Sequence, residues 1–153
     1  ASYPEGSERQ KASVQWFNDL KAIHARNAYD WNGGIGLEQL SWLDSELQKA
    51  DRKGQWAVLM CHIPLLPFDE GDSLWNAMEV TRVIEAHPSV KAVLTGHRHG
   101  GGYVLRNGIH HVIFKGMVQG ESNRYAVITI DTASARIMID GYGDETDRVL
   151  ETE

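Results

Sequence analysis

Three histidines, His62, His97 and His99, are the residues of this 153-residue chain whose types and spacing could do chemistry. His62 directly follows an apolar run at residues 56–61, and His97 and His99 closely follow a second, mainly apolar stretch at residues 90–94. His97 and His99 are two positions apart in a glycine-rich segment, so both rings can turn toward one centre. Neutral imidazole is the commonest nitrogen ligand of borderline divalent metals. The sequence therefore predicts a metal site formed by these three histidines.

Each of these two features, the histidine after a strand and the histidine pair in a glycine-rich segment, could by itself have a purely structural role. A histidine at the end of a strand is commonly a hydrogen-bonded polar residue, and Gly96-His97-Arg98-His99 could be an ordinary glycine-rich turn. Two successive predicted strands that each lead into histidine are hard to explain by packing alone. The combination therefore favours metal binding.

The other four histidines do not follow this pattern, and we expect none of them to bind a metal directly. His24 falls on a predicted helix surface, and His87 falls at a predicted helix C-terminus, where the helix dipole favours a cation. His110 and His111 are neighbours in a predicted strand, so one should face inward and the other outward. Either of these two could still support the site or face a substrate.

The elements that must position the three histidines are two buried strands and the helix between them. The continuous apolar run at residues 56–61 is typical of a strand covered on both faces, and the mainly apolar residues 90–94 predict the next buried strand. A helix that is capped by Asp72 or Ser73 and ends before Pro88 connects them. Such a strand–helix–strand crossover is almost always right-handed, and ligands bind at the carboxyl ends of its strands. We therefore expect the histidines to converge at one edge of an α/β sheet.

Two further helices are expected before these strands, and hairpins after them. Apolar spacing predicts helices over residues 13–30 and 37–54, separated by a glycine-rich turn in which Trp31 could stack on a flat ligand. Trp42 and Cys61 are expected to fill the core. Asn107-Gly108 predicts a hairpin of residues 103–106 and 109–114, and a second hairpin is expected from residues 125–131 and 135–140.

The composition of the chain excludes some classes of function. Fifteen Lys and Arg against 21 Asp and Glu give a net charge of -6, which argues against non-specific binding of nucleic acid polymers. No apolar run is long enough to cross a bilayer, so we expect no membrane partner. The length, 153 residues, fits a single domain at residues 1–153. A single cysteine, Cys61, cannot form an internal disulfide, which fits a reducing compartment and leads us to expect a cytoplasmic location.

The strand-end His62 and the Gly96-His97-Arg98-His99 element resemble the C-terminal half of the calcineurin-like metallophosphoesterases. The segments WNGGIGLEQLSWLDSEL, CHIPLLP, LWNAMEV, HPSVKAVLTGHRHGGGY and HHVIFKG are similar to the manganese-dependent ADP-ribose/CDP-alcohol diphosphatase branch. The resemblance covers residues 30–143. It implies an α/β fold, the C-terminal half of a four-layer α/β/β/α metallophosphoesterase sandwich.

The resemblance also implies a chemistry. His62 and His97 would bind one divalent ion and His99 a second, with Mn or Fe expected and Zn possible. The two metals would activate a hydroxide that attacks phosphorus in a small phosphorylated or nucleotide-diphosphate substrate. The expected function is hydrolysis of phosphoester or pyrophosphate bonds in nucleotide-linked small molecules.

One departure from the family is decisive for what we expect of this chain by itself. The family's first-half motifs, D-x-H, G-D and G-N-H-[DE], do not occur in residues 1–61. Three neutral imidazoles without a carboxylate are a poor ligand set for two dications. We therefore expect a C-terminal part of a longer phosphoesterase that supplies metal ligands but no catalytic residue, and that is inactive alone. The substrate-binding residues stay open.

Two other functions stay open from the sequence. The chain could be a non-catalytic binding or oligomerising fragment with vestigial histidines, and exposed apolar sheet faces would then promote self-association. A mononuclear zinc hydrolase with three histidine ligands is a further option, although no general base accompanies the cluster.

Overall fold

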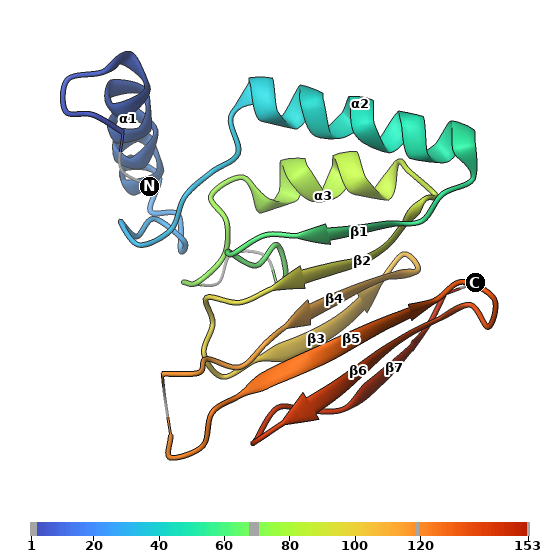
Figure 1. Cartoon of the computed structure of the whole chain (residues 1–153). Helices are drawn as coiled ribbons and strands as arrows, with labels where there is room; N and C mark the ends of the chain where they lie inside the picture. The colour runs from blue at the N-terminus through green and yellow to red at the C-terminus, as the bar shows by residue number, and fades with distance from the viewer. Residues whose placement is uncertain (1–2, 68–70, 119, 153) are drawn as a thin grey trace.

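A helical layer and two β-sheets make up most of the molecule in this computed structural model, which describes residues 3–67, 71–118 and 120–152. Helices α2 (Leu37–Lys53) and α3 (Ala77–Glu85) cover one face of a four-stranded sheet. The other face packs on a three-stranded sheet, while α1 (Glu8–Ala22) stands at one end of these layers (Figure 1). Among the described helices, none is both long and apolar enough to cross a membrane.

The four-stranded sheet carries the predicted crossover. Its order is β1 (Ala57–Met60), β2 (Val90–Thr95), β4 (Ile109–Ile113) and β3 (Gly102–Arg106). The first three strands are parallel, and β3 pairs antiparallel with β4 through the predicted hairpin. The carboxyl ends of β1, β2 and β4 therefore lie along one edge of the sheet, as the sequence predicts.

The second sheet is antiparallel, in the order β5 (Tyr125–Asp131), β6 (Arg136–Tyr142) and β7 (Arg148–Glu151). The hairpin of β5 and β6 confirms the predicted pair. Sequence reasoning missed β7, because this four-residue strand buries one apolar side chain, Leu150, and has no clear alternation of its own.

Two apolar cores explain why β2 is mainly apolar. Val93 points to the helices and packs in the core with Leu47 and Ile84. Leu94 points the other way and packs between the sheets with Ile137. Because successive side chains of a strand face opposite sides, a strand between two layers needs apolar residues at nearly every position.

The ends of two predicted helices were wrong. Helix α1 begins at Glu8 rather than near residue 13, because the Ser7 hydroxyl accepts a hydrogen bond from the Gln10 amide and caps it. It ends at Ala22 rather than at residue 30, and the backbone has left the helical conformation by His24, where φ is +54°. Helix α3 begins at Ala77 after Asn76, so Asp72 and Ser73 belong to the preceding loop.

Two residues expected in the core are exposed. Trp42 is 59% exposed on the outer side of α2, and Cys61 is exposed just beyond β1. Cys61 follows the edge strand of its sheet, and Trp42 lines a groove between α1 and α2 instead of the core beneath α2.

Candidate metal centre

His62 and His97 meet at the edge of the sheet where β1 and β2 end. The His97 Nδ1 and His62 Nε2 atoms are 3.2 Å apart, and the rings meet edge to face with centroids 5.0 Å apart. Ligand nitrogens lie about 2.1 Å from a borderline metal ion such as zinc. Two nitrogens at this separation would subtend an angle of about 100° at one ion, close to tetrahedral or octahedral values. This pair therefore fits a shared metal ion.

The backbone at His97 is held in an uncommon conformation. His97 has φ +63°, and the Arg98 amide donates to the Gly96 carbonyl at 2.7 Å, which closes a γ-turn around it. A positive φ is uncommon for a residue with a side chain, and such strain clusters at functional sites. The turn brings the imidazole back toward His62.

Asn32 is a third member of this cluster, and sequence reasoning did not single it out. Its Oδ1 lies 3.0 Å from His97 Nε2, and the side chain is buried. The only signal in the sequence was its place in the glycine-rich turn beside Trp31. A contact between positions 32 and 97 has no local pattern that could reveal it.

His99 lies near the pair but does not complete it. Its ring is exposed and lies against the Gly116 backbone, where a Cβ would come within 2.7 Å of the ring. The Gly116 amide also donates to the His99 carbonyl at 3.0 Å. Within the described part of the chain, no group of three or more His, Cys, Asp or Glu side chains is arranged to hold a metal. The ligand role of His62, His97 and His99 therefore stays a prediction, with His62 and His97 already in contact.

The electrostatic surroundings favour a neutral His97. Burial lowers the pKa of His97, and positive charge on His62 and His99 lowers it further, while Asp72 acts in the opposite direction. The net shift is downward. Neutral imidazole is the form that binds metal, so these surroundings suit a ligand.

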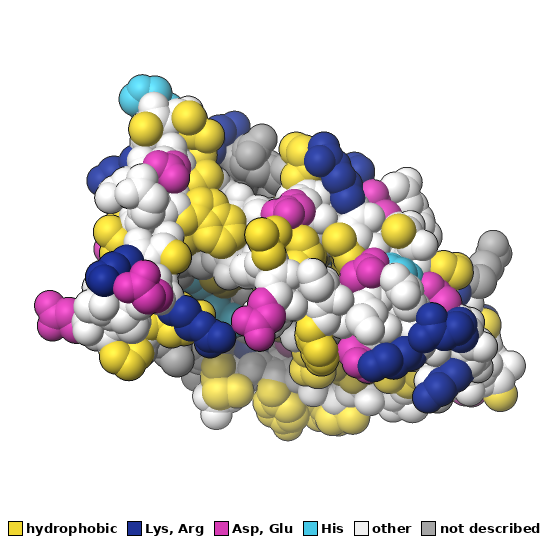
Figure 2. Space-filling model, turned by 90° about the horizontal axis from the view of Figure 1, so that it is seen from above, with side chains coloured by type: hydrophobic (Ala, Val, Ile, Leu, Met, Phe, Trp, Pro, Cys, Tyr) yellow, Lys and Arg dark blue, Asp and Glu magenta, His cyan; other side chains and the backbone are white. Residues whose placement is uncertain are grey.

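Two hollows adjoin the cluster. A shallow one of about 460 Å³ lies at the carboxyl ends of β1 and β2 and includes His62 and Gly96 in its lining. A larger groove of about 840 Å³ runs between α1 and α2, and its walls include Asn32, Trp16 and Trp42. Figure 2 shows this groove as a depression in the surface.

The aromatic residue expected to stack on a ligand lies elsewhere. Trp31 is 54% exposed and stacks on Tyr29, with ring centroids 4.2 Å apart, and it is not among the residues that line the groove. Its proposed contact with a flat ligand stays a prediction.

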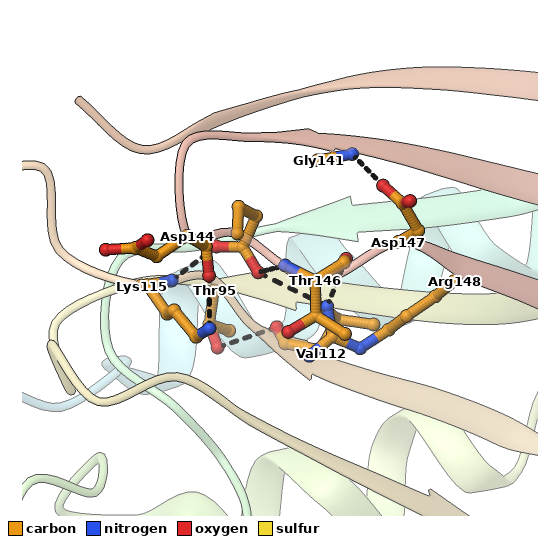
Figure 3. Close-up of polar contacts among 9 residues, drawn as sticks. Thr95, Val112, Lys115, Gly141, Asp144, Thr146, Asp147 and Arg148 are labelled. Carbon is orange, nitrogen blue, oxygen red and sulfur yellow. Dashed lines mark hydrogen bonds and ion pairs between the residues drawn. The ribbon is translucent and has the colours of Figure 1, made fainter. Parts of the chain in front are cut away.

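A buried carboxylate anchors the loop next to His99. Figure 3 shows the polar contacts around Lys115 at the end of β4. The Glu145 carboxylate accepts hydrogen bonds from the Lys115 amide (2.7 Å) and the Thr146 amide (2.8 Å), and it pairs with Arg148 at 3.3 Å. Its side chain is 1% exposed. These contacts join the two sheets and hold the segment that leads into Gly116.

The remaining histidines lie away from the cluster. His24 is exposed, just beyond the end of α1. His87 is buried behind α3, 2.6 Å from an Asp51 oxygen and 3.1 Å from an Asp44 oxygen. Burial lowers the pKa of His87, but hydrogen bonds and charge from the two carboxylates raise it more, so the net shift is upward.

One prediction about these histidines was wrong: His110 and His111 are both buried, whereas one was expected to face outward. The reason is that β4 is a central strand covered on both faces. His110 contacts the Glu151 carbonyl of the second sheet at 2.9 Å. His111 faces the helical side, and within the described residues neither of its ring nitrogens has a hydrogen-bond partner.

Comparison with known proteins supports the resemblance seen in the sequence. No family model matches the chain. A manganese-dependent ADP-ribose/CDP-alcohol diphosphatase from Arabidopsis thaliana is 35% identical over 132 residues, which are 84% of this chain and 41% of that protein. Proteins of the same description from Xenopus laevis and Homo sapiens are 34% and 32% identical over 78% and 87% of this chain. These matches cover 35% and 40% of the two proteins.

A solved structure confirms the fold. The crystal structure of a dimetal phosphatase from Danio rerio superposes with a TM-score of 0.89 at 24% identity, over 99% of this chain and 53% of that one. The chain thus has the α/β fold of about half of a dimetal phosphatase. It spans about two fifths of the length of the curated relatives it matches.

Proposed function

We propose, from the premise that the chain is similar to about two fifths of a manganese-dependent ADP-ribose/CDP-alcohol diphosphatase, that it supplies histidine ligands to a di-metal phosphoesterase. The observation that carries this proposal is the 3.2 Å approach of His97 Nδ1 and His62 Nε2 at the ends of two parallel strands. The substrate would be a small molecule with a nucleotide-linked diphosphate.

The chain's own residues would act by holding and orienting. His62 and His97 would hold one divalent ion, and His99 would hold the second after its ring leaves the Gly116 backbone. Two manganese ions, when bound, supply Lewis acids that stabilise the attacking and phosphoryl oxygens. The hollow beside His62 leaves space for a phosphoryl group at the ends of β1 and β2. Three neutral imidazoles are a poor ligand set for two dications, so we expect acidic ligands from another polypeptide segment.

Uncovered apolar surface supports the proposal of an incomplete unit. The outer face of the second sheet exposes Tyr125, Val127, Tyr142 and Val149, and Met60 is 78% exposed at the edge strand β1. Contiguous exposed apolar patches mark interaction surfaces. We expect this chain by itself to self-associate through these surfaces, which sedimentation at several concentrations would measure. A cytoplasmic location stays a prediction from the single cysteine.

Metal binding is the first test. Calorimetry would measure Mn²⁺ binding to the chain, to His62→Ala and His97→Ala variants, and to His24→Ala as the matched control on the exposed surface. We expect weak binding that both site variants abolish and the control keeps. Equal heats for the chain and a variant without His62, His97 and His99 would instead support a fragment with vestigial histidines.

Catalysis is tested by restoring the missing part. The matching half of the Danio rerio dimetal phosphatase would be replaced by this chain, and Mn²⁺-dependent hydrolysis of ADP-ribose would be measured. We expect turnover by the chimera that falls at least 100-fold on His97→Ala, and no turnover by the chain alone. Robust turnover by the chain alone, lost on His97→Ala, would refute its incompleteness and favour a mononuclear zinc or manganese hydrolase.

A further inference from the structure

The orientation of the Asn32 side chain is determined by its own hydrogen bonds. Its Nδ2 donates to the Asn27 carbonyl at 2.9 Å and to the Gly71 carbonyl at 2.7 Å. Both partners are carbonyl oxygens, which can only accept. A flipped carboxamide would place its oxygen against two other oxygens. Asn32 Oδ1 must therefore be the atom that faces His97.

This orientation decides which ring nitrogen of His97 carries the proton. Asn32 Oδ1 lies 3.0 Å from His97 Nε2, and an oxygen that can only accept requires Nε2 to donate. A neutral imidazole carries one N–H, so the lone pair is then on Nδ1. Nδ1 is the atom that lies 3.2 Å from His62 Nε2, where a metal ion would be shared.

We propose that Asn32 is a positioning residue that keeps His97 in the Nε2–H tautomer, with the Nδ1 lone pair directed at the metal position beside His62. Ligand histidines in metal sites are generally oriented by a hydrogen bond to the other ring nitrogen. What Nδ1 binds rests on the proposed function; the tautomer itself does not.

The surroundings make Asn32 a rigid support. Asn32 is 8% exposed. Other hydrogen bonds fix the turn that carries it: the Trp75 amide donates to the Gly33 carbonyl at 2.8 Å. The Ile35 amide donates to Asn76 Oδ1 at 3.0 Å, and Asn76 Nδ2 donates to the Ile35 carbonyl at 2.9 Å. Asn32 therefore has little freedom to follow His97, and His97 must adapt to Asn32.

The metal-free chain tests the tautomer. Nitrogen-15 NMR of the histidine rings at pH 8 distinguishes an N–H nitrogen from one with a lone pair. We expect His97 to show Nε2–H alone in the unaltered chain. We expect Asn32→Leu, which removes the acceptor, to give a mixture of both tautomers. A His97 ring with Nδ1–H in the unaltered chain, or an unchanged single tautomer in Asn32→Leu, would overturn the proposal.

Metal affinity gives the second readout. Loss of an outer partner of a ligand histidine typically weakens binding 10–100-fold, so Asn32→Leu should weaken Mn²⁺ binding by that factor. Asn76→Ala, the matched control, loosens the same turn without touching His97 and should change affinity less than about threefold.

The outcomes separate the two proposals. Equal losses in Asn32→Leu and Asn76→Ala would mean that Asn32 only stabilises the turn, and would overturn the positioning role. If the unaltered chain binds no Mn²⁺, the proposed function fails. The NMR comparison then still decides the role of Asn32, because it is made without metal.

Discussion

The buried histidine of β4, His111, should make the stability of this chain acid-sensitive. It is 4% exposed, and neither ring nitrogen has a hydrogen-bond partner in the part of the chain that the structure describes. Burial lowers the pKa of His111 to about 4, with Arg106 and His110 acting in the same direction and Glu85 against it. The folded state therefore keeps this ring neutral at pH values where the unfolded chain protonates it.

The sign and size follow from proton linkage. Between pH 6.5 and about 4 the unfolded state binds the proton and the folded state does not, so the free energy of unfolding falls as pH falls. A difference of roughly 2.5 pKa units corresponds to about 3 kcal/mol in full. Between pH 7 and pH 4.5, roughly 2 kcal/mol of this should be lost.

The perturbation is His111→Leu, which replaces the ring with an apolar side chain. At pH 7 we expect the free energy of unfolding to stay within about 1 kcal/mol or rise, because two unpaired ring nitrogens are removed. Urea denaturation followed by tryptophan fluorescence at pH 7 and pH 4.5 gives the measurement. The loss on acidification should be roughly 2 kcal/mol smaller in the variant than in the unaltered chain.

The control is His24→Asn, at an exposed position with positive φ that asparagine tolerates. It should lose the same stability on acidification as the unaltered chain. If His111→Leu also lost the same stability, then His111 would be protonated equally in both states, and the reasoning from its burial would be wrong.

Three further predictions concern packing and charge. The raised pKa of His87 contributes stability that is complete below pH 6.5 and lost at higher pH, so Asp51→Asn should destabilise the chain by about 1 kcal/mol at pH 6 and by less at pH 9 in urea titrations. Glu145→Ala should lower the free energy of unfolding by about 3 kcal/mol in the same assay, because the Lys115 and Thr146 amides and the half-buried Arg148 all lose this buried carboxylate. A Cβ at Gly34 would lie 2.4 Å from the Trp16 ring, so Gly34→Ala should displace that ring and speed hydrogen exchange in α1 at least tenfold; unchanged exchange would contradict this contact.

Much of the fold could be predicted from the sequence because its signals are local. The run before His62, the run before His97 and the Asn107-Gly108 turn each identify an element from neighbouring residues alone. The missed strand β7 is short and owes its place to pairing with β6, which is a long-range interaction. Trp42 and Cys61 were misplaced because apolar type does not say which side of an element another layer covers.

The sequence by itself determined that His62 and His97 come at the carboxyl ends of successive parallel strands, since that follows from the order of strand, helix and strand. Only the tertiary structure decided that these two rings contact each other while His99 lies against Gly116. It also decided that Asn32 contacts His97, which is 65 positions away in the sequence. The physical reason is that strand formation depends on the spacing of apolar residues along the chain. The direction of a side chain and the proton on a ring nitrogen depend on whichever partners packing brings within 3 Å.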